Sequence, residues 1–595
     1  MNPQISLELL CRNSQELRAF ARKGKILGQN IQEDQIQPAS FEPRLSDELF
    51  AISTKGNELF RPSGRSSIYR QLLEEVPHHR RTKINCSEGY ELKKGFTYVL
   101  RLQEKLKIDP GELVKSSPKS SLGRLFVNSR LMADYNGSFD EITHQIPDDI
   151  ELWLLVQPLA FNMIVYPDIS LNQLRFFSHD MDCSLSDREL KEEYEKNPIL
   201  FDKESGLPLN PVIKKGLQVH LDLEGKSTAG VVGFRAIDNP EPIDLKKKAF
   251  YKNEDFFEPI LKGRVVIDPQ EHYLFPTLEK LVFPSHLNAE LQATSHIGTS
   301  GPWHFAGFID NDFAGDLVLE LQSQEQTSVR LEHGMPVSRM EVFRTKKPDK
   351  LYGMDINSNY SGQIGARTAK YFMPIDYDVI AKNYDKLNRD VLVVESRRLL
   401  AYRNQEQGFE EIARTDSEPM FEEINNGFFA SRYQCEDDRL VLQPIAYILL
   451  FGPDKTVYTY VRSGSIKDFG EKKLFGKHSI GVGGHVARSD APEYIPSSAE
   501  RELTEEVVVG KRESDLILQG TLMCYNLPVD TVHFGLVYAM MTDGDIRHRE
   551  SSIQRGKMIN IQELLEFPLH SQAYETWSNE LFPYLTDIYN SLKQQ

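Results

Sequence analysis

Residues 316–342 read D-L-V-L-E-L-Q-S-Q-E-Q-T-S-V-R-L-E-H-G-M-P-V-S-R-M-E-V. An apolar strand, a polar turn, a second strand, another turn and a third strand follow one another, a pattern typical of a β meander. An earlier stretch at 151–176, E-L-W-L-L-V-Q-P-L-A-F-N-M-I-V-Y-P-D-I-S-L-N-Q-L-R-F, has the same order. The two stretches predict a diverged internal duplication of an all-β unit. The alternative is a chance likeness between two generic meanders.

At 595 residues the chain is too long for one hydrophobic core. It divides into regions that differ in their sequence pattern. Short strand-like runs broken by Gly, Pro, Asn and Asp suggest β barrels or sandwiches. A charged stretch, S-D-R-E-L-K-E-E-Y-E-K at 186–196, predicts an exposed helical connector. Later strands alternate with helices near 497–509 and at 573–593, which indicates a mixed α/β unit. The predicted divisions are 1–185 (first β repeat), 186–204 (connector), 205–375 (second β repeat) and 376–595 (α/β domain).

Composition narrows the class of protein. A net charge of −17 argues against nonspecific nucleic-acid binding, and no apolar run reaches the ~18 residues of a membrane span. The N-terminal stretch lacks the basic-then-apolar order of a signal peptide, so we expect a cytoplasmic protein. Five scattered cysteines without a C-x-x-C pair give poor support for structural zinc or a disulfide framework. Zinc-dependent deaminases need H-x-E together with P-C-x-x-C, and this chain has no P-C-x-x-C, so we expect no zinc.

A short polar motif in the first repeat suggests a binding site for a polyanion. Residues 119–124 read K-S-S-L-G-R, with Lys119, Ser120, Ser121 and Arg124 as hydrogen-bond donors. Chemistry at this site would need a general base, and none lies nearby in the sequence.

Glu320 is the candidate for that base. It lies in an apolar strand between Leu319 and Leu321, and strand alternation places it on the opposite face from both. Burial would raise its pKa toward the range that is useful for proton transfer. Its counterpart in the first repeat is Leu155, whereas the second repeat has A-T-S-H-I-G in place of K-S-S-L-G-R. The alternative is that Glu320 faces solvent on a half-exposed strand.

With these motifs in place, the first ~375 residues resemble the dCTP deaminase branch of the trimeric dUTPase-like superfamily, in its duplicated form. Asp310 and Glu320 keep the family's ten-residue separation, and Tyr352, Asn359 and Gln363 keep the spacing of its C-terminal triphosphate-binding segment. The motifs behind the resemblance are Q-P-A-S-F-E-P-R-L at 37–45, P-K-S-S-L-G-R at 118–124, D-F-F-E-P-I at 255–260, A-G-F-I-D at 306–310, V-L-E at 318–320, G-M-P-V-S-R at 334–339 and S-N-Y-S-G-Q at 358–363.

The resemblance implies a role for each matching residue. Glu320 would activate water for attack at C4 of cytosine, while Ser120 and Arg124 would position that water and the leaving amine. The remaining matches would bind substrate: Ala306 and Asp310 at the base and sugar, and Lys119, Ser121, Tyr352, Asn359 and Gln363 at the pocket and the phosphates. Magnesium would bridge the triphosphate.

Departures from the family pattern leave the reaction open. Glu42 and Pro43 replace the first two residues of the usual D-L-R-L, and Asn359 stands where many relatives have lysine. The I-D-N-D-F sequence at 309–313 is closer to the dUTPase branch, in which the Asp after Ile activates water against a phosphate. The site could therefore hydrolyse dUTP as well as make it. Glu320 favours deamination over a pure dUTPase, because the dUTPase branch lacks it.

A second constellation lies at 479–509. Ser497 and Glu500 predict a capping box, after which Glu502, Glu505 and Glu506 share one helical face. Three carboxylates on one face suggest a hard divalent cation, and the alternative is an acidic exposed helix.

These residues resemble the Nudix box, G-x5-E-x7-R-E-U-x-E-E-x-G-U, in which U is aliphatic. Glu493, Arg501, Leu503 and the three glutamates match without gaps. Gly484 lies three residues too far from Glu493, and Val508 replaces the late glycine. The resemblance implies Mg²⁺, with Mn²⁺ as an alternative, held by Glu502, Glu505 and Glu506 with support from Glu493. Glu505 and Glu506 would carry the hydrolysis of a diphosphate linkage, and Arg501 would orient a carboxylate.

Together the motifs predict two tandem dUTPase-like all-β barrels followed by an α/β/α Nudix domain. The expected protein is a homo-oligomeric nucleotide-pool enzyme that makes dUTP from dCTP and cleaves a nucleoside diphosphate linkage, such as that of dUTP to give dUMP and pyrophosphate. One alternative is a bifunctional deaminase–dUTPase site beside a Nudix domain for a modified nucleotide. Another is a nucleotide sensor without turnover.

Overall fold

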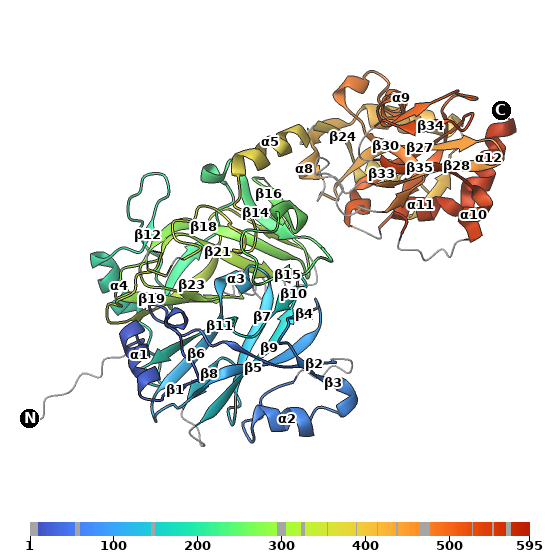
Figure 1. Ribbon diagram of the computed structural model, residues 1–595. Helices are drawn as coiled ribbons and strands as arrows, with labels where there is room; N and C mark the ends of the chain where they lie inside the picture. Colours follow the sequence, from blue (N-terminus) through green and yellow to red (C-terminus); the bar gives the residue numbers. More distant parts are fainter. Residues whose placement is uncertain are drawn as a thin grey trace, which may run out of the picture. The chain divides into compact units, whose positions relative to one another are not determined.

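The computed structural model describes the chain except for residues 1–9, 54–59, 144–148, 264, 294–304, 323–327, 354, 357, 388–389, 413, 436–437, 463–476, 526–527, 550–552, 567–572 and 595. The chain divides into two compact units, Met1–Ile380 and Ala381–Gln595, coloured blue to yellow and yellow to red (Figure 1). No helix of the described residues is long and apolar enough to cross a membrane.

Short strands form the first half of the first unit. One sheet has the strand order β3-β2-β5-β9-β7, with β1 paired to β5. A second sheet has the order β11-β6-β8, and β4 pairs with β10 in a third. The elements are α1 (Ser14–Arg22), β1 (Ile26–Leu27), β2 (Leu45–Ile52), α2 (Ile68–Glu74), β3 (Arg81–Asn85), β4 (Tyr90–Leu92), β5 (Thr97–Leu106), β6 (Leu113–Pro118), α3 (Ser120–Gly123), β7 (Val127–Ala133), β8 (Glu141–Thr143), β9 (Ile150–Pro158), β10 (Met163–Val165) and β11 (Asn172–Phe177).

The second half begins with the predicted connector helix. A reciprocal capping box between Ser186 and Glu189 starts α4 (Asp187–Lys196), which is only partly exposed because Leu190 and Tyr194 are buried. The elements that follow are β12 (Leu200–Phe201), β13 (Leu217–His220), β14 (Val231–Ala236), β15 (Ile243–Asp244), β16 (Phe257–Leu261), β17 (Val265–Ile267), β18 (His272–Val282), β19 (Leu287–Ala293), β20 (Phe308–Ile309), β21 (Ala314–Gln322), β22 (Val329–Leu331), β23 (Pro336–Arg344) and α5 (Tyr377–Leu387).

The strand pairings of the two halves repeat. β4–β10, β5–β9 and β6–β11 in the first half correspond to β17–β22, β18–β21 and β19–β23 in the second. Leu155 pairs with Val99, and Glu320 pairs with Leu274 at the equivalent position. The predicted alignment of Leu155 with Glu320 therefore agrees with the register of both ladders, as an internal duplication requires.

The two halves share one hydrophobic core. A continuous cluster of buried apolar side chains extends from Leu17 to Phe372 and contains members of both halves. Leu122, Leu125 and Phe126 from the K-S-S-L-G-R region lie in the same cluster as Val318 of β21. This shared core brings the polar turn of the first half close to the Glu320 strand of the second.

A mixed sheet forms the centre of the second unit. Its long strand β27 (Val441–Gly452) pairs parallel with β33 (His533–Met541) and is almost wholly buried. Helices α7 and α9 supply buried side chains to one core, and α10, α11 and α12 supply them to a second. The helices therefore cover both faces of the sheet. The remaining strands are β24 (Asp390–Glu395), β25 (Gly408–Glu411), β26 (Phe428–Ser431), β28 (Thr456–Arg462), β29 (His478–Ser479), β30 (Gly481–His485), β31 (Val507–Val509), β32 (Ile517–Met523), β34 (Ile546–His548) and β35 (Ile553–Asn560), and the helices are α6 (Ser396–Leu400), α7 (Arg414–Asn425), α8 (Arg432–Cys435), α9 (Tyr494–Glu506), α10 (Ile561–Glu566), α11 (Thr576–Leu581) and α12 (Leu585–Gln594).

The predicted bounds of the acidic helix and its capping box are wrong. Helix α9 begins at Tyr494 instead of 497, with Glu493 at the N-cap and no side-chain cap bond. Ser497 therefore lies inside the helix, where its N–H donates to the carbonyl of Glu493 (3.0 Å). Pro496 is tolerated because it lies in the first turn, where N–H groups have no intrahelical partner. The helix ends at Glu506, since the β-branched residues 507–509 form β31.

Candidate active sites

A tight turn presents the K-S-S-L-G-R motif. Strand β6 ends at Pro118, and α3 follows at once, closed by a hydrogen bond from the N–H of Leu122 to the carbonyl of Lys119 (2.7 Å). The Leu122 side chain is buried in the shared core and anchors the turn. Arg124 caps the turn and is 3% exposed, which places a permanent cation inside the protein.

Arg124 is held by the segment between β23 and α5. Its Nη1 donates to the carbonyl of Arg367 (2.8 Å), and its Nη2 donates to Oε1 of Gln363 (3.0 Å). The guanidinium carbon lies 3.8 Å from the centre of the Tyr360 ring, and the Tyr360 hydroxyl is 2.7 Å from that of Ser121. Among the contacts of the described residues, Nε of Arg124 is buried without a hydrogen-bond partner. A buried donor without a partner is costly, so it marks a place for a substrate atom or a water.

Glu320 lies against the same turn, from β21 of the second half. It is 2% exposed, so the alternative of a solvent-facing carboxylate is wrong. One carboxylate oxygen accepts from the N–H of Ala306 (3.0 Å), and a Cβ added to Gly123 would lie 2.6 Å from the other. Burial raises the pKa of Glu320 to about 7, and the Arg124 guanidinium limits the rise. At this pKa the carboxyl group can both take up and release a proton near neutral pH.

A cavity of about 280 Å³ lies beside the turn. Eight of the predicted site residues line it, namely Lys119, Ser120, Ser121, Arg124, Asp310, Tyr352, Asn359 and Gln363. The predicted residues Ala306 and Glu320 are not on its wall but lie next to Gly123. The structure therefore brings together residues from both repeats of the same chain.

Cations that sequence reasoning missed also line the cavity. Lys248 and Lys370 reach it from two separate loops, and Lys119 forms an ion pair with Glu42. Burial and the nearby Lys119 lower the pKa of Lys370 to about 8. Asn359 could have pointed to Lys370. Many relatives have a lysine at the position of Asn359, so a chain without that lysine needs a cation from elsewhere in the sequence.

Arg175 is a second residue that the sequence did not reveal. It comes from β11 in the first half, and its side chain is 0% exposed. It donates to the carbonyls of Ala289 (2.6 Å) and Ile309 (2.9 Å) and to Oδ1 of Asp310 (3.3 Å). Arg175 thus fixes the loop that carries Asp310, whose own pKa is raised by burial and lowered in part by this cation.

In the second unit, glycines bring β30 close to α9. Gly483 has a φ of +149°, and a Cβ there would lie 1.8 Å from the carbonyl oxygen of Ala446, so only glycine fits. Its N–H donates to Oε2 of Glu506 (3.2 Å). A Cβ on Gly484 would lie 2.7 Å from both carboxylate oxygens of Glu502. The matched Nudix-box glycines and glutamates are therefore neighbours.

Arg501 contacts carboxylates, as the sequence predicts for it. It donates to both carboxylate oxygens of Asp490 (2.8 and 2.9 Å), to Oε1 of Glu502 (2.6 Å) and to Oε2 of Glu505 (3.1 Å). Glu505 and Glu493 are exposed. As they stand, no three acidic, imidazole or thiolate side chains among the described residues form a group that could hold a metal ion. The carboxylate oxygens of the three helical glutamates are of the kind that a hard divalent cation prefers, and Arg501 contacts two of these side chains, Glu502 and Glu505.

A smaller cavity of about 60 Å³ lies beside β30 in the second unit. Gly484, His485, His533, Tyr447 and Trp577 contribute to its wall. Nε2 of His485 is 3.2 Å from Nε2 of His533, and burial lowers the pKa of His485 well below its usual value. The His485 ring is therefore uncharged at neutral pH.

Comparisons with known proteins divide in the same way as the structure. The family model "2'-deoxycytidine 5'-triphosphate deaminase (DCD) N-terminal domain" matches residues 11–180, and the C-terminal domain model of the same enzyme matches residues 186–372. A curated relative, "dCTP deaminase, dUMP-forming" from Corynebacterium glutamicum, is 35% identical over 178 residues, which is 26% of this chain and 94% of that protein. One of the same name from Corynebacterium efficiens is 27% identical over 197 residues, or 32% and 94%.

Solved structures also resemble both units. The crystal structure of 2'-deoxycytidine 5'-triphosphate deaminase from Agrobacterium tumefaciens has a TM-score of 0.52 at 25% identity, covering 59% of this chain and 99% of that one. Tm1382, a candidate Nudix hydrolase, has a TM-score of 0.28 at 24% identity, covering 34% of this chain and all of that one.

Proposed function

We propose that this chain, which belongs to the dCTP deaminase family through residues 11–372, deaminates dCTP to dUTP at the Glu320 site. The observation that carries the proposal is the position of Glu320, a buried carboxylate with a pKa near 7 beside the K-S-S-L-G-R turn. In this proposal the two halves of the first unit are tandem dUTPase-like β barrels, and only the combination of both completes a site.

The residues present can carry each proton that the reaction moves. Glu320 would take a proton from a water, and the resulting hydroxide would attack C4 of cytosine. The same carboxyl group would pass this proton to N3 and would then move the proton of the new C4 hydroxyl to the departing amine, so that ammonia leaves and C4 becomes a carbonyl. The unpartnered Nε of Arg124 and the hydroxyl of Ser120 are the donors available to stabilise the intermediate. Lys119, Lys248 and Lys370 would bind the triphosphate.

For the second unit, we propose hydrolysis of the diphosphate linkage of dUTP to give dUMP and pyrophosphate. Glu502, Glu505 and Glu506 would hold Mg²⁺ or Mn²⁺ with support from Glu493, and the ion would supply charge stabilisation and an activated water. The support is the shared helical face of the three glutamates and their approach to Gly483 and Gly484.

The alternative route to dUMP uses the first cavity itself. Asp310 lines that cavity in an I-D-N-D-F sequence and is held by Arg175. The full chain carrying Glu505→Gln and Glu506→Gln separates the two routes. Given dCTP and Mg²⁺, this variant should release ammonia at the wild-type rate but accumulate dUTP, as measured by chromatography of the nucleotides. Continued formation of dUMP would assign the hydrolysis to the Asp310 cavity, and absence of ammonia from the wild-type reaction would remove the proposed deaminase function.

The pH dependence of deamination should be bell-shaped. Glu320 must be ionised to act as a base, so kcat/KM should rise as the pH increases through about 7. Lys370 loses its charge as the pH increases through about 8, so phosphate binding should weaken on the alkaline side. The Lys370→Arg variant keeps its charge at all these pH values and should move the alkaline limb upward without moving the acid limb. An alkaline limb that stays in place would exclude Lys370 as its source.

A further inference from the structure

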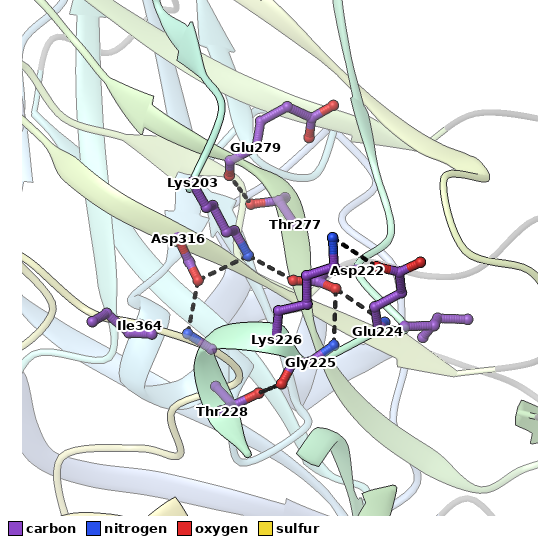
Figure 2. Close-up of polar contacts among 12 residues, drawn as sticks. Lys203, Asp222, Glu224, Gly225, Lys226, Thr228, Thr277, Glu279, Asp316 and Ile364 are labelled. Carbon is purple, nitrogen blue, oxygen red and sulfur yellow. Dashed lines mark hydrogen bonds and ion pairs between the residues drawn. The ribbon is translucent and has the colours of Figure 1, made fainter. Parts of the chain in front are cut away.

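Outside the cavity, a buried lysine joins two aspartates (Figure 2). Lys203 follows β12, and its Nζ lies 2.9 Å from Oδ2 of Asp222 and 3.0 Å from Oδ2 of Asp316. The three side chains are only 14%, 9% and 5% exposed. Two carboxylates this close in a buried place repel each other, so the cation between them offsets a large electrostatic cost.

Asp316 binds the segment between β23 and α5 through hydrogen bonds. Its Oδ2 accepts from the N–H of Gly365 (2.8 Å), and its own N–H donates to the carbonyl of Gln363 (3.0 Å). The side-chain amide of Gln363 donates back to the main-chain carbonyl of Asp316. Three hydrogen bonds at one residue therefore fix Gln363 and Gly365 against β21, and Figure 2 shows the one that the Asp316 carboxylate accepts beside Ile364.

The same segment reaches Arg124. Gln363 accepts from Arg124 through Oε1, and the carbonyl of Arg367 accepts from the other terminal nitrogen. A continuous series of contacts thus leads from Lys203 through Asp316 and Gln363 to the guanidinium in the proposed site. None of the motifs that mark the family includes Lys203 or Asp316.

We propose that Lys203 is a positioning residue. It keeps Asp316 in place, so that Asp316 holds residues 359–367 against the cavity and keeps Gln363 in contact with Arg124. The kinetic part of this inference rests on the proposed deaminase function, whereas its structural part does not. Lys203 touches neither the cavity wall nor the predicted reacting atoms.

The charge balance explains why the lysine matters. Burial raises the pKa of Asp316, and Lys203 opposes that rise. Burial also acts on Asp222, but there Lys203 and backbone donors prevail and lower the pKa. Without the ammonium group, the carboxyl group of Asp316 would be under greater pressure to take up a proton or to turn toward solvent. In either case the hydrogen bond from Gly365 would weaken.

The test compares Lys203→Met with Lys226→Met in the full chain. Lys226 lies near the same cluster but pairs with Glu204 and Glu224 at the surface, so its loss should change little. In Lys203→Met, amide hydrogen exchange at 359–367 should be at least about tenfold faster, as expected for the loss of a charge-assisted contact. KM for dCTP should rise about tenfold, with kcat changed by less than about threefold, because closure of the segment belongs to binding.

A rescue variant distinguishes a positioning role of Lys203 from a general loss of folding. The double variant Lys203→Met with Asp316→Asn removes the charge of Asp316, one of the two that Lys203 compensates, but keeps an acceptor for the N–H of Gly365. It should recover most of the slow exchange and of the KM. Unchanged exchange in Lys203→Met, or no recovery in the double variant, would overturn the positioning role. If the wild-type protein does not turn over dCTP, the proposed function fails, and the exchange measurements still decide the role of Lys203.

Discussion

Glu320→Gln should abolish the release of ammonia from dCTP. The amide keeps the shape of the side chain and an oxygen that can accept from Ala306, but it cannot take a proton from water. Loss of a positioned general base lowers rates by about 10²–10⁴-fold, and this carboxylate would both accept and return the proton. We therefore expect ammonia release below about 1% of the wild-type rate in a coupled ammonia assay.

The stability of this variant should not explain the loss. Burial raises the pKa of Glu320 from 4.5 to about 7, so the group favours the protonated form in the folded protein. Ionising it opposes folding increasingly as the pH rises from about 4.5 to 7, and the full cost remains above 7. Glutamine never ionises, so the variant should melt at or above the wild-type temperature at pH 8.

Glu104 offers a matched control for Glu320. It is also a buried glutamate with a pKa raised by burial, and it accepts from the N–H of Arg44 (2.8 Å). Its carboxylate contacts Gln35 and Arg44 instead of the K-S-S-L-G-R turn, so Glu104→Gln should retain ammonia release within about twofold. Ammonia release by Glu320→Gln at more than a tenth of the wild-type rate would contradict the role of Glu320.

Among these substitutions, Arg175→Met should lower the free energy of unfolding the most. The change leaves the buried Asp310 carboxylate without its cation and takes a donor from the carbonyls of Ala289 and Ile309. Removal of one partner from a buried ion pair costs about 3–5 kcal/mol. We expect the free energy of unfolding to fall by this amount, as measured by urea denaturation through the transition that unfolds the first unit.

The control for Arg175 is an exposed ion pair in the same unit. Arg188 pairs with Glu192 on the surface of α4, and the two side chains are 88% and 57% exposed. Arg188→Met should change the free energy of unfolding by less than about 0.5 kcal/mol. Adding Asp310→Asn to Arg175→Met should recover part of the lost stability, because no buried charge then remains unpaired. A loss below about 1 kcal/mol for Arg175→Met would show that the pair does not hold this loop.

The sequence predicted those features that repeat locally. Strand alternation placed Glu320 on the opposite face from Leu319 and Leu321 but left open whether that face is buried, and the comparison of two meanders aligned Glu320 with Leu155 in register. The i, i+3 and i+4 spacing likewise placed Glu502, Glu505 and Glu506 on one face of a helix. Such patterns depend only on the period of a strand or a helix, so one sequence is enough to reveal them.

The sequence did not predict the features that depend on contacts between distant segments. Arg175 reaches Asp310 across 135 positions, and Lys203 reaches Asp316 from the connector. No local pattern distinguishes these two cations from exposed ones. The capping box at Ser497 was wrong for a related reason. Its spacing was correct, but the helix had already begun at Tyr494.

The central claim is that one chain completes its own site, with Glu320 from the second repeat beside the K-S-S-L-G-R turn of the first. The most direct test mixes two inactive variants, Glu320→Gln and Arg124→Met, after joint unfolding and refolding so that copies can exchange. Ammonia release from dCTP should stay at the level of the separate variants, because each chain carries one defect in its only combined site. Recovery of about a quarter of the wild-type activity would mean that Glu320 and Arg124 meet between copies, and would contradict the account.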